Sequence, residues 1–121
     1  MTVTLHNENE TCDSILDGSI TLIQPKHGYR FSIEAILLAR FARATTRDRV
    51  LELGAGCGVV SIMMATLYHP REVVAIEIQP PLSDMIARNV AINQLKLVTV
   101  VNADLRQKEI ANVSKTAEST K

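Results

Sequence analysis

A group of acids and glycines in the middle of the chain has the composition of a nucleotide-sized binding site. Glu52 stands two residues before the first of three alternating glycines, in the turn Gly54-Ala55-Gly56-Cys57-Gly58. Two further acids, Glu77 and Asp104, each follow a later apolar run. Glycine lets the backbone take positive φ and approach a ligand without a Cβ. We therefore expect these residues to line one pocket.

The arrangement of acid and glycines indicates which ligand this pocket takes. A dinucleotide-binding turn reads G-x-G-x-x-G and places a pyrophosphate at a helix N-terminus. This turn is one residue shorter, and Glu52 beside it would repel a pyrophosphate. A carboxylate there favours a cationic nucleoside such as S-adenosylmethionine, whose ammonium and sulfonium groups are both positive. Glu77 is then placed to accept hydrogen bonds from both ribose hydroxyls, and Asp104 to meet the adenine amino group.

The segments that must position these residues alternate between strand and helix patterns. We expect strands at residues 50–53, 72–77 and 97–101, and helices at residues 59–68 and from Pro80 onward. The interior of the 72–77 run is wholly apolar, which is typical of a parallel strand covered on both faces. Right-handed crossovers give the strand order 3-2-1 and bring the acids to the carboxyl edge of the sheet. The sequence predicts an α/β half-sheet whose first strand lies at an exposed edge.

A hairpin and a helix precede this half-sheet. Residues 13–23 have a hairpin pattern, with Asp17-Gly18 as its two-residue turn. Residues 33–42 have a helical pattern that begins after Ser32, a typical N-cap residue, and we expect the helix to end near Ala44 to Arg47. Apolar residues at helical spacing predict the buried stripe of this helix, which only Arg40 interrupts; they are Ile33, Ile36, Leu37 and Phe41.

The loop before this helix contains Tyr29 and Phe31, half of the aromatic residues of the chain. Two interpretations of these rings are open. They pack the helix on the sheet, or the loop folds over the ligand and one ring covers it.

Composition limits the remaining possibilities. A chain of 121 residues is one domain by length, and its equal numbers of basic and acidic residues, 13 each, give no argument for a nucleic-acid or membrane partner. Residues 21–49 are nevertheless basic, either as a solvated face or as a contact to a phosphate backbone. Two cysteines, Cys12 and Cys57, make no disulfide framework, and no apolar run approaches a membrane span. We expect a cytoplasmic protein without a metal site.

The two ends of the chain are polar. We expect residues 1–12 to be flexible, residues 13–113 to form the binding domain, and residues 114–121 to be a disordered tail. A short helical piece is predicted at residues 106–113.

Four segments resemble the bacterial valine-tRNA adenine-N6 methyltransferases, which are Rossmann-like class I enzymes that use S-adenosylmethionine. The turn alone fits any class I methyltransferase, whereas the segment before it is more specific. The segments are residues 24–39, which include Tyr29-Arg30-Phe31-Ser32, residues 50–58, Glu77-Ile78-Gln79, and residues 88–93.

The resemblance implies a role for each part of the site. Glu52 and the glycine turn bound the methionine end of the cofactor, and Glu77 holds the ribose. Asp104 and Leu105 flank the adenine, while Tyr29 to Ser32 line the front. The cofactor-binding residues that we expect are Tyr29, Arg30, Phe31, Ser32, Glu52, Gly54, Ala55, Gly56, Cys57, Gly58, Glu77, Ile78, Asp104 and Leu105.

The resemblance also has a gap. The family carries an Asn-Pro-Pro-Tyr motif after a fourth strand, where it holds the target amino group and stacks on the base, as a flipped base requires. The pair Pro80-Pro81 precedes a helix and is not that motif. We therefore expect this chain to carry the cofactor-binding half of an adenine-N6 tRNA methyltransferase, with no catalytic residues of its own.

Two other functions are open. The first is a non-catalytic module, which either binds the cofactor or forms a homodimer through the exposed sheet edge. A nicotinamide-dependent oxidoreductase is disfavoured by the glycine spacing and by Glu52.

Overall fold

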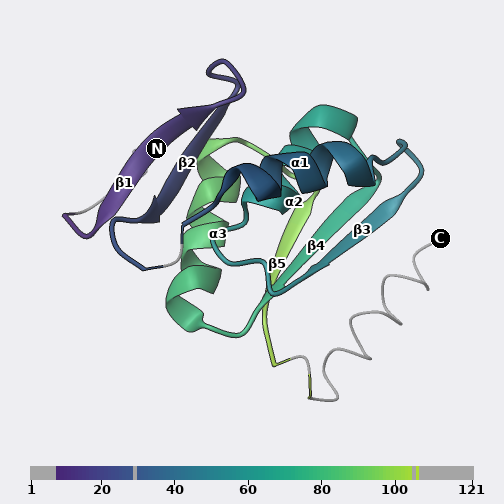
Figure 1. Ribbon diagram of the computed structural model, residues 1–121. Coiled ribbons are helices and arrows are strands. Elements are labelled where there is room, and N and C mark those ends of the chain that lie inside the picture. Colours follow the sequence, from purple (N-terminus) through teal and green to yellow (C-terminus); the bar gives the residue numbers. More distant parts are fainter. Residues whose placement is uncertain (1–7, 29, 105, 107–121) are drawn as a thin grey trace.

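The computed structural model of the chain describes residues 8–28, 30–104 and 106 (Figure 1). Its elements follow the predicted order of hairpin, helix and alternating strands and helices. They are β1 (Glu10–Ile15), β2 (Ile20–Pro25), α1 (Ile33–Ala42), β3 (Arg49–Leu53), α2 (Val59–Tyr68), β4 (Glu72–Glu77), α3 (Pro80–Ile92) and β5 (Val98–Asn102).

The main sheet has three parallel strands in the order β3-β4-β5. Leu51 of β3 lies opposite Val74 of β4, which in turn lies opposite Thr99 of β5. The predicted order is thus confirmed, with the first strand of the half-sheet, β3, at an edge. Consecutive right-handed crossovers that step in one direction place both connecting helices on one face of the sheet.

That face carries the main contacts between helices and sheet. Val50, Val73 and Ala75 pack against apolar residues of α2 and α3. The residues of β3 that alternate with them point the other way, and Leu51 and Leu53 are 46% and 53% exposed. In β4, Val73 to Glu77 are all buried, as the uninterrupted apolar run indicated.

The hairpin forms a separate two-stranded sheet that packs against α3 (Figure 1). Asp17 and Gly18 both have positive φ, and the Ser19 amide donates to the Leu16 carbonyl at 3.1 Å. Asp17 and Gly18 are thus the central residues of the turn, but the last strand pair is Ile15 with Ile20, so the loop has four residues rather than the predicted two. β1 begins at Glu10, so it includes residues 10–12, which the sequence assigned to the flexible N-terminal segment. These polar residues join the strand because the backbone of β2 pairs with them as far as Pro25.

α1 begins at Ile33 as predicted but ends at Ala42, before the predicted end near Ala44 to Arg47, because Arg43 takes a positive φ of 50°. Its buried face also differs from the prediction. Its buried residue is Ala39, whereas Ile33, Leu37 and Phe41 of the predicted stripe are 65%, 58% and 87% exposed. The reason is that α1 packs on α2, where the Tyr68 hydroxyl donates to the Ala39 carbonyl at 3.0 Å. The small side chain of Ala39 lets the backbone of α1 lie against α2.

The start of α1 also differs in detail from the prediction. Ser32 stands at the N-cap position with an extended backbone, but its side chain makes no capping hydrogen bond. Its carbonyl accepts from the Ala35 amide at 3.0 Å instead.

Some predictions fall on residues outside the described ranges, namely residues 1–7, Tyr29, Leu105 and residues 107–121. Among the helices that are described, none combines the length and hydropathy needed to cross a bilayer.

Candidate functional site

The glycine turn connects β3 to α2 at the carboxyl edge of the sheet. Gly54, Gly56 and Gly58 all take left-handed backbone conformations, with φ of 68°, 61° and 89°. The Ala55 amide donates to the Ile76 carbonyl at 3.0 Å, which ties the turn to β4. A residue with a Cβ would be strained at each of the three glycines, so their alternation follows from the backbone path.

Two of these glycines meet different surroundings. A Cβ on Gly58 would lie 2.9 Å from Cγ2 of Ile86, because α3 packs directly on the turn there. A Cβ on Gly54 would have no heavy atom within 4 Å. Gly58 is therefore required by packing, whereas Gly54 borders open space that a ligand can occupy.

Two cavities meet at Gly54. The larger, of about 390 Å³, lies between the start of α1 and the end of β3, and the smaller, of about 280 Å³, lies at the ends of β4 and β5. The larger is lined by Arg30, Ser32, Glu34, Ala35, Leu38, Glu52, Leu53, Gly54 and Val60. The smaller is lined by Gly54, Ile76, Ile78, Ala103, Asp104 and Arg106.

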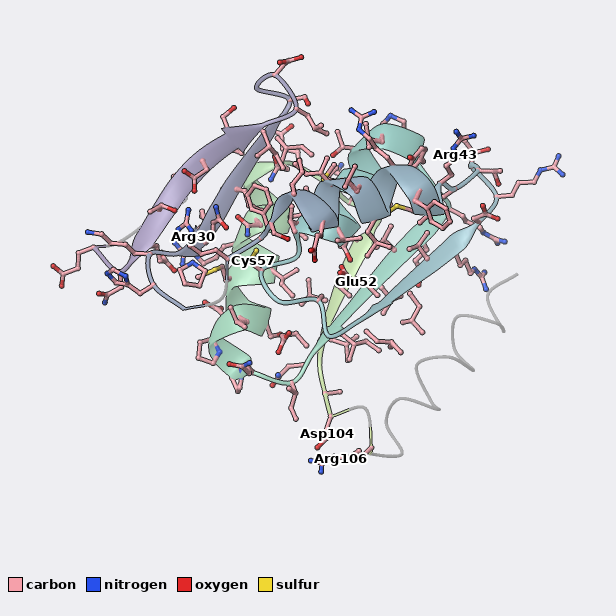
Figure 2. The ribbon with its side chains drawn as sticks, viewed as in Figure 1. Arg30, Arg43, Glu52, Cys57, Asp104 and Arg106 are labelled. Carbon is pink, nitrogen blue, oxygen red and sulfur yellow. The ribbon has the colours of Figure 1, made fainter. Side chains whose placement is uncertain are left out.

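Glu52 supplies a carboxylate to the wall of the larger cavity, beneath α1 in Figure 2. Its Oε1 accepts from the amide and the hydroxyl of Ser61, at 3.0 and 2.5 Å. No other hydrogen bond to Glu52 occurs among the described residues, which leaves Oε2 available to a ligand. Burial raises the pKa of Glu52, although the two bonds from Ser61 act in the opposite direction. A cation beside it would restore the charged form.

Glu77 has a structural role, which its position in the sequence did not indicate. It is only 5% exposed, and its Oε1 accepts from the Gly56 amide at 2.7 Å while Oε2 accepts from the Gln79 amide at 2.8 Å. The carboxylate thus joins the glycine turn to the start of α3. It lines neither cavity. Its contact with a ribose remains a prediction.

Asp104 lies at the outer end of the smaller cavity and is bound by Arg106, as Figure 2 shows. The distance from Arg106 Nη2 to Asp104 Oδ2 is 2.6 Å. Hydrogen bonds from Arg106 lower the pKa of Asp104 to about 2. Ile78, 51% exposed, adds apolar surface to the same cavity, and Asn102 fixes this region by donating to the Ile78 carbonyl at 3.0 Å. The cavity thus combines an apolar wall with a carboxylate acceptor.

The described residues of the front segment are fixed by the hairpin. Arg30 donates to the Pro25 carbonyl at 2.7 Å, and the Phe31 amide donates to Gln24 Oε1 at 3.1 Å. The Phe31 ring packs against the main hydrophobic cluster, which favours packing over ligand contact for this ring. Ser32 lines the larger cavity.

Cys57 is in the turn but is not available for chemistry. It is fully buried, and burial raises the pKa of its thiol to about 11. The small side chain fills the core, as a small hydrophobe does. Across residues 8–28, 30–104 and 106, no three His, Cys, Asp or Glu side chains come together as metal ligands.

Three residues that support the site were missed by the reasoning from sequence. Ser61 holds Glu52, Gln24 holds Phe31, and Asn89 contacts both β2 and the turn. Asn89 is fully buried; it falls in the 88–93 segment of the family resemblance, which assigned it no role, and its other signal was a second asparagine four residues later on a helix with an apolar stripe. Ser61 stands in an apolar helix run, where a small polar residue gives no distinct signal.

Comparison with known proteins gives one family. The model of the TRM5/TYW2 methyltransferase domain matches residues 25–118. A curated tRNA1(Val) (adenine(37)-N6)-methyltransferase from a Flavobacteriaceae bacterium (strain 3519-10) is 29% identical over 69 residues, which are 57% of this chain and 30% of that protein.

Solved structures show the same fold. M. jannaschii TYW2 in complex with AdoMet superimposes with a TM-score of 0.74 at 23% identity, over 84% of this chain and 47% of that one. The M. jannaschii tRNA m1G37 methyltransferase gives a TM-score of 0.67 at 21% identity, over 84% of this chain and 32% of that one. The chain thus spans less than half the length of each of these proteins.

Proposed function

The chain belongs to the TRM5/TYW2 methyltransferase domain family, and from this premise we propose that it binds S-adenosylmethionine where the two cavities meet. The observation that carries the proposal is Gly54, a left-handed glycine that borders both cavities and whose missing Cβ leaves open space. A single elongated ligand that passes over Gly54 can fill both cavities.

The chemistry of the lining residues fits the two ends of this cofactor. In the larger cavity, the carboxylates of Glu52 and Glu34 would face the positive ammonium and sulfonium groups of the cofactor. In the smaller cavity, Ile78 offers an apolar surface to a flat base, and Asp104 can accept from an exocyclic amino group. When bound, the cofactor supplies an electrophilic methyl group, and the chain orients it and balances its charge. The fold shared with M. jannaschii TYW2, which was solved in complex with AdoMet, supports this fit.

The acceptor that we favour is the N6 amino group of an adenine in tRNA. Support comes from the curated relative, which is named as an enzyme of this kind. The M. jannaschii tRNA m1G37 methyltransferase, which has the same fold, supports a tRNA substrate equally well but is named for a guanine target. A tRNA substrate would place the chain in the cytoplasm, which agrees with the free thiols of Cys12 and Cys57.

Calorimetric titration tests cofactor binding. We expect the full chain to bind S-adenosylhomocysteine with one site per chain, and NADH to produce no heat of binding. Tight binding of NADH would favour an oxidoreductase instead. A folded chain that binds neither ligand would contradict the proposal.

A glycine pair gives this titration a matched control. Gly54→Ala and Gly28→Ala both place a Cβ on a left-handed residue with nothing within 4 Å, but only Gly54 lines the cavities. We expect Gly54→Ala to weaken binding by about tenfold or more, since about 1.4 kcal/mol of lost contact has this effect. Gly28→Ala should leave the affinity unchanged.

The acceptor is tested separately. The chain is incubated with tRNA and S-adenosylmethionine that carries a labelled methyl group, and the nucleosides are then identified by mass. If the chain transfers the methyl group, the expected labelled product is N6-methyladenosine, whereas labelled 1-methylguanosine would show that guanine is the target. Cofactor binding without any labelled nucleoside would support the non-catalytic alternative.

The edge of β3 supports a second part of the proposal, a homodimer. Among the described strands β3 pairs with β4 alone. Glu34 lines the cavity at the carboxyl end of β3, and Arg43 lies near the amino end of β3 (Figure 2). An antiparallel pairing of two copies would therefore place acids opposite bases. Sedimentation should show a dimer, and a strict monomer at high concentration would exclude this pairing.

A further inference from the structure

Asn89 joins two segments that are far apart in the sequence. Its Oδ1 accepts from the Ile23 amide at 2.7 Å, and its Nδ2 donates to the Ile23 carbonyl at 2.8 Å. The same Nδ2 also donates to the Cys57 carbonyl at 3.0 Å. One fully buried side chain thus binds β2 and the glycine turn together.

On the hairpin side, this contact continues to the front wall of the larger cavity. Gln24 follows Ile23 and accepts from the Phe31 amide at 3.1 Å, and the Pro25 carbonyl accepts from Arg30 at 2.7 Å. Arg30 lines the cavity. The position of β2 therefore determines where the front wall stands.

On the turn side, the contact reaches the glycine turn, whose first residue, Gly54, lines the same cavity. The peptide between Cys57 and Gly58 presents its carbonyl to Asn89, and its amide donates to the Ala55 carbonyl at 2.9 Å. This second bond closes the turn that begins at Gly54. The orientation of one peptide thus links Asn89 to the backbone that borders both cavities.

We propose that Asn89 is a positioning residue that sets the spacing between the front wall and the glycine turn, and so couples docking of the hairpin to binding of the cofactor. This role rests on the proposed cofactor site. Asn89 itself touches no cavity and contacts no ligand.

Asn93 provides a matched control on the next turn of α3. It makes the same pair of bonds to the hairpin, accepting from the Thr21 amide at 2.9 Å and donating to the Thr21 carbonyl at 2.7 Å. Its remaining bond, to the Asn89 carbonyl at 2.7 Å, stays within α3. Each asparagine thus makes two bonds to the hairpin, but only Asn89 reaches the turn.

Titration of the full chain with S-adenosylhomocysteine compares Asn89→Ala with Asn93→Ala. Both variants should be less stable than the wild type, because each leaves hairpin backbone groups without partners. Only Asn89→Ala should also weaken binding by the folded protein, by about tenfold. Equal affinities in the two variants would overturn the positioning role. A folded wild type that does not bind would overturn the proposed function, and with it this role.

Hydrogen exchange of the wild type gives a second test, which does not require a variant to fold. Coupling through Asn89 predicts that the ligand slows exchange of the Ile23 amide severalfold more than exchange of the Thr21 amide. A merely structural role for Asn89 predicts equal slowing at both amides, since the ligand would then only stabilise the whole fold. Equal slowing would contradict the coupling.

Discussion

Both flanks of the molecule carry large apolar side chains, but the two flanks bury them to different extents. On the hairpin flank, Ile20, Leu22 and Ile23 are fully buried, and asparagines of α3 bind the backbone between them. On the flank formed by α1 and β3, Phe41 is 87% exposed and Leu53 is 53% exposed. The hydrophobic content of a segment therefore does not decide its burial, because burial requires a partner of matching shape.

The candidate site lies between these flanks. Its rear wall, the glycine turn, is held by the buried side, through Ile86, Asn89 and Glu77. Its front cavity opens toward the exposed side, where Leu38 and Leu53 line it. Contrasting substitutions on the two flanks test this division.

The largest expected effect comes from shortening leucines on opposite flanks. Leu22→Ala should lower the free energy of unfolding by about 2–5 kcal/mol, because it leaves a cavity in the core. Leu51→Ala, at a residue that is 46% exposed, should lower it by less than about 1 kcal/mol. Urea unfolding of both variants measures this, and equal losses would mean that the β3 flank is as well packed as the hairpin flank.

The next effect concerns the packing of α3 on the turn. Gly58→Ala should cost about 1–2 kcal/mol for its left-handed backbone and about 1–3 kcal/mol more for overpacking against Ile86. Gly28 has a φ of 93° and open space where its Cβ would lie. Gly28→Ala should therefore lose stability only through the strain of the left-handed backbone. Thermal unfolding compares the two, and an equal loss of stability would show that Ile86 moves aside easily.

A smaller, pH-dependent effect is expected at Glu52. Burial raises its pKa above the ordinary value of 4.5, so its ionisation destabilises the folded chain as pH rises through the raised pKa. Glu52→Gln keeps an acceptor for Ser61 and should increase stability at pH 7 while weakening cofactor binding.

The pH dependence separates this effect from a general change in packing. The gain in stability should disappear below pH 4.5, where the carboxyl is neutral in both the folded and unfolded chain. Denaturant unfolding at several pH values measures it, with the exposed Glu34→Gln as the control. A gain that persists in acid would contradict the assigned cause.

The smallest effect is expected at the exposed ion pair of the smaller cavity. Arg106 lowers the pKa of Asp104 to about 2, so Arg106→Gln should return it toward 3.8. Any stability from the pair is present above pH 3.8 and is lost as pH falls toward 2. An NMR titration of the carboxyl carbon follows this, with Arg43→Gln as a control, and an unchanged pKa would show that another group holds Asp104.

Some features followed directly from the sequence because they are locally encoded. β4 and α2 have the predicted bounds, since each is an apolar run limited by glycine, proline or charge. The strand order followed from the handedness of the crossovers. The glycine turn was recognisable because glycine is the residue that takes a left-handed backbone conformation with the least strain.

Other features depend on contacts between distant segments and could not be predicted. α1 has apolar residues on both sides, so its periodicity could not show that Ala39 would face α2 and that Phe41 would face solvent. Glu77 was recognised as an acid at a strand end, but its bonds to two backbone amides depend on where the turn and α3 meet. Asn89 resembles a surface residue until the hairpin is docked.

An NMR titration of the isotope-labelled chain with S-adenosylhomocysteine shows whether one ligand occupies both cavities across Gly54. We predict that the amides of Ser32, Gly54 and Ala103 shift together and give a single dissociation constant. Shifts confined to one cavity, or separate dissociation constants for Ser32 and Ala103, would contradict a single site. The absence of any shift in the folded chain would contradict the cofactor site itself.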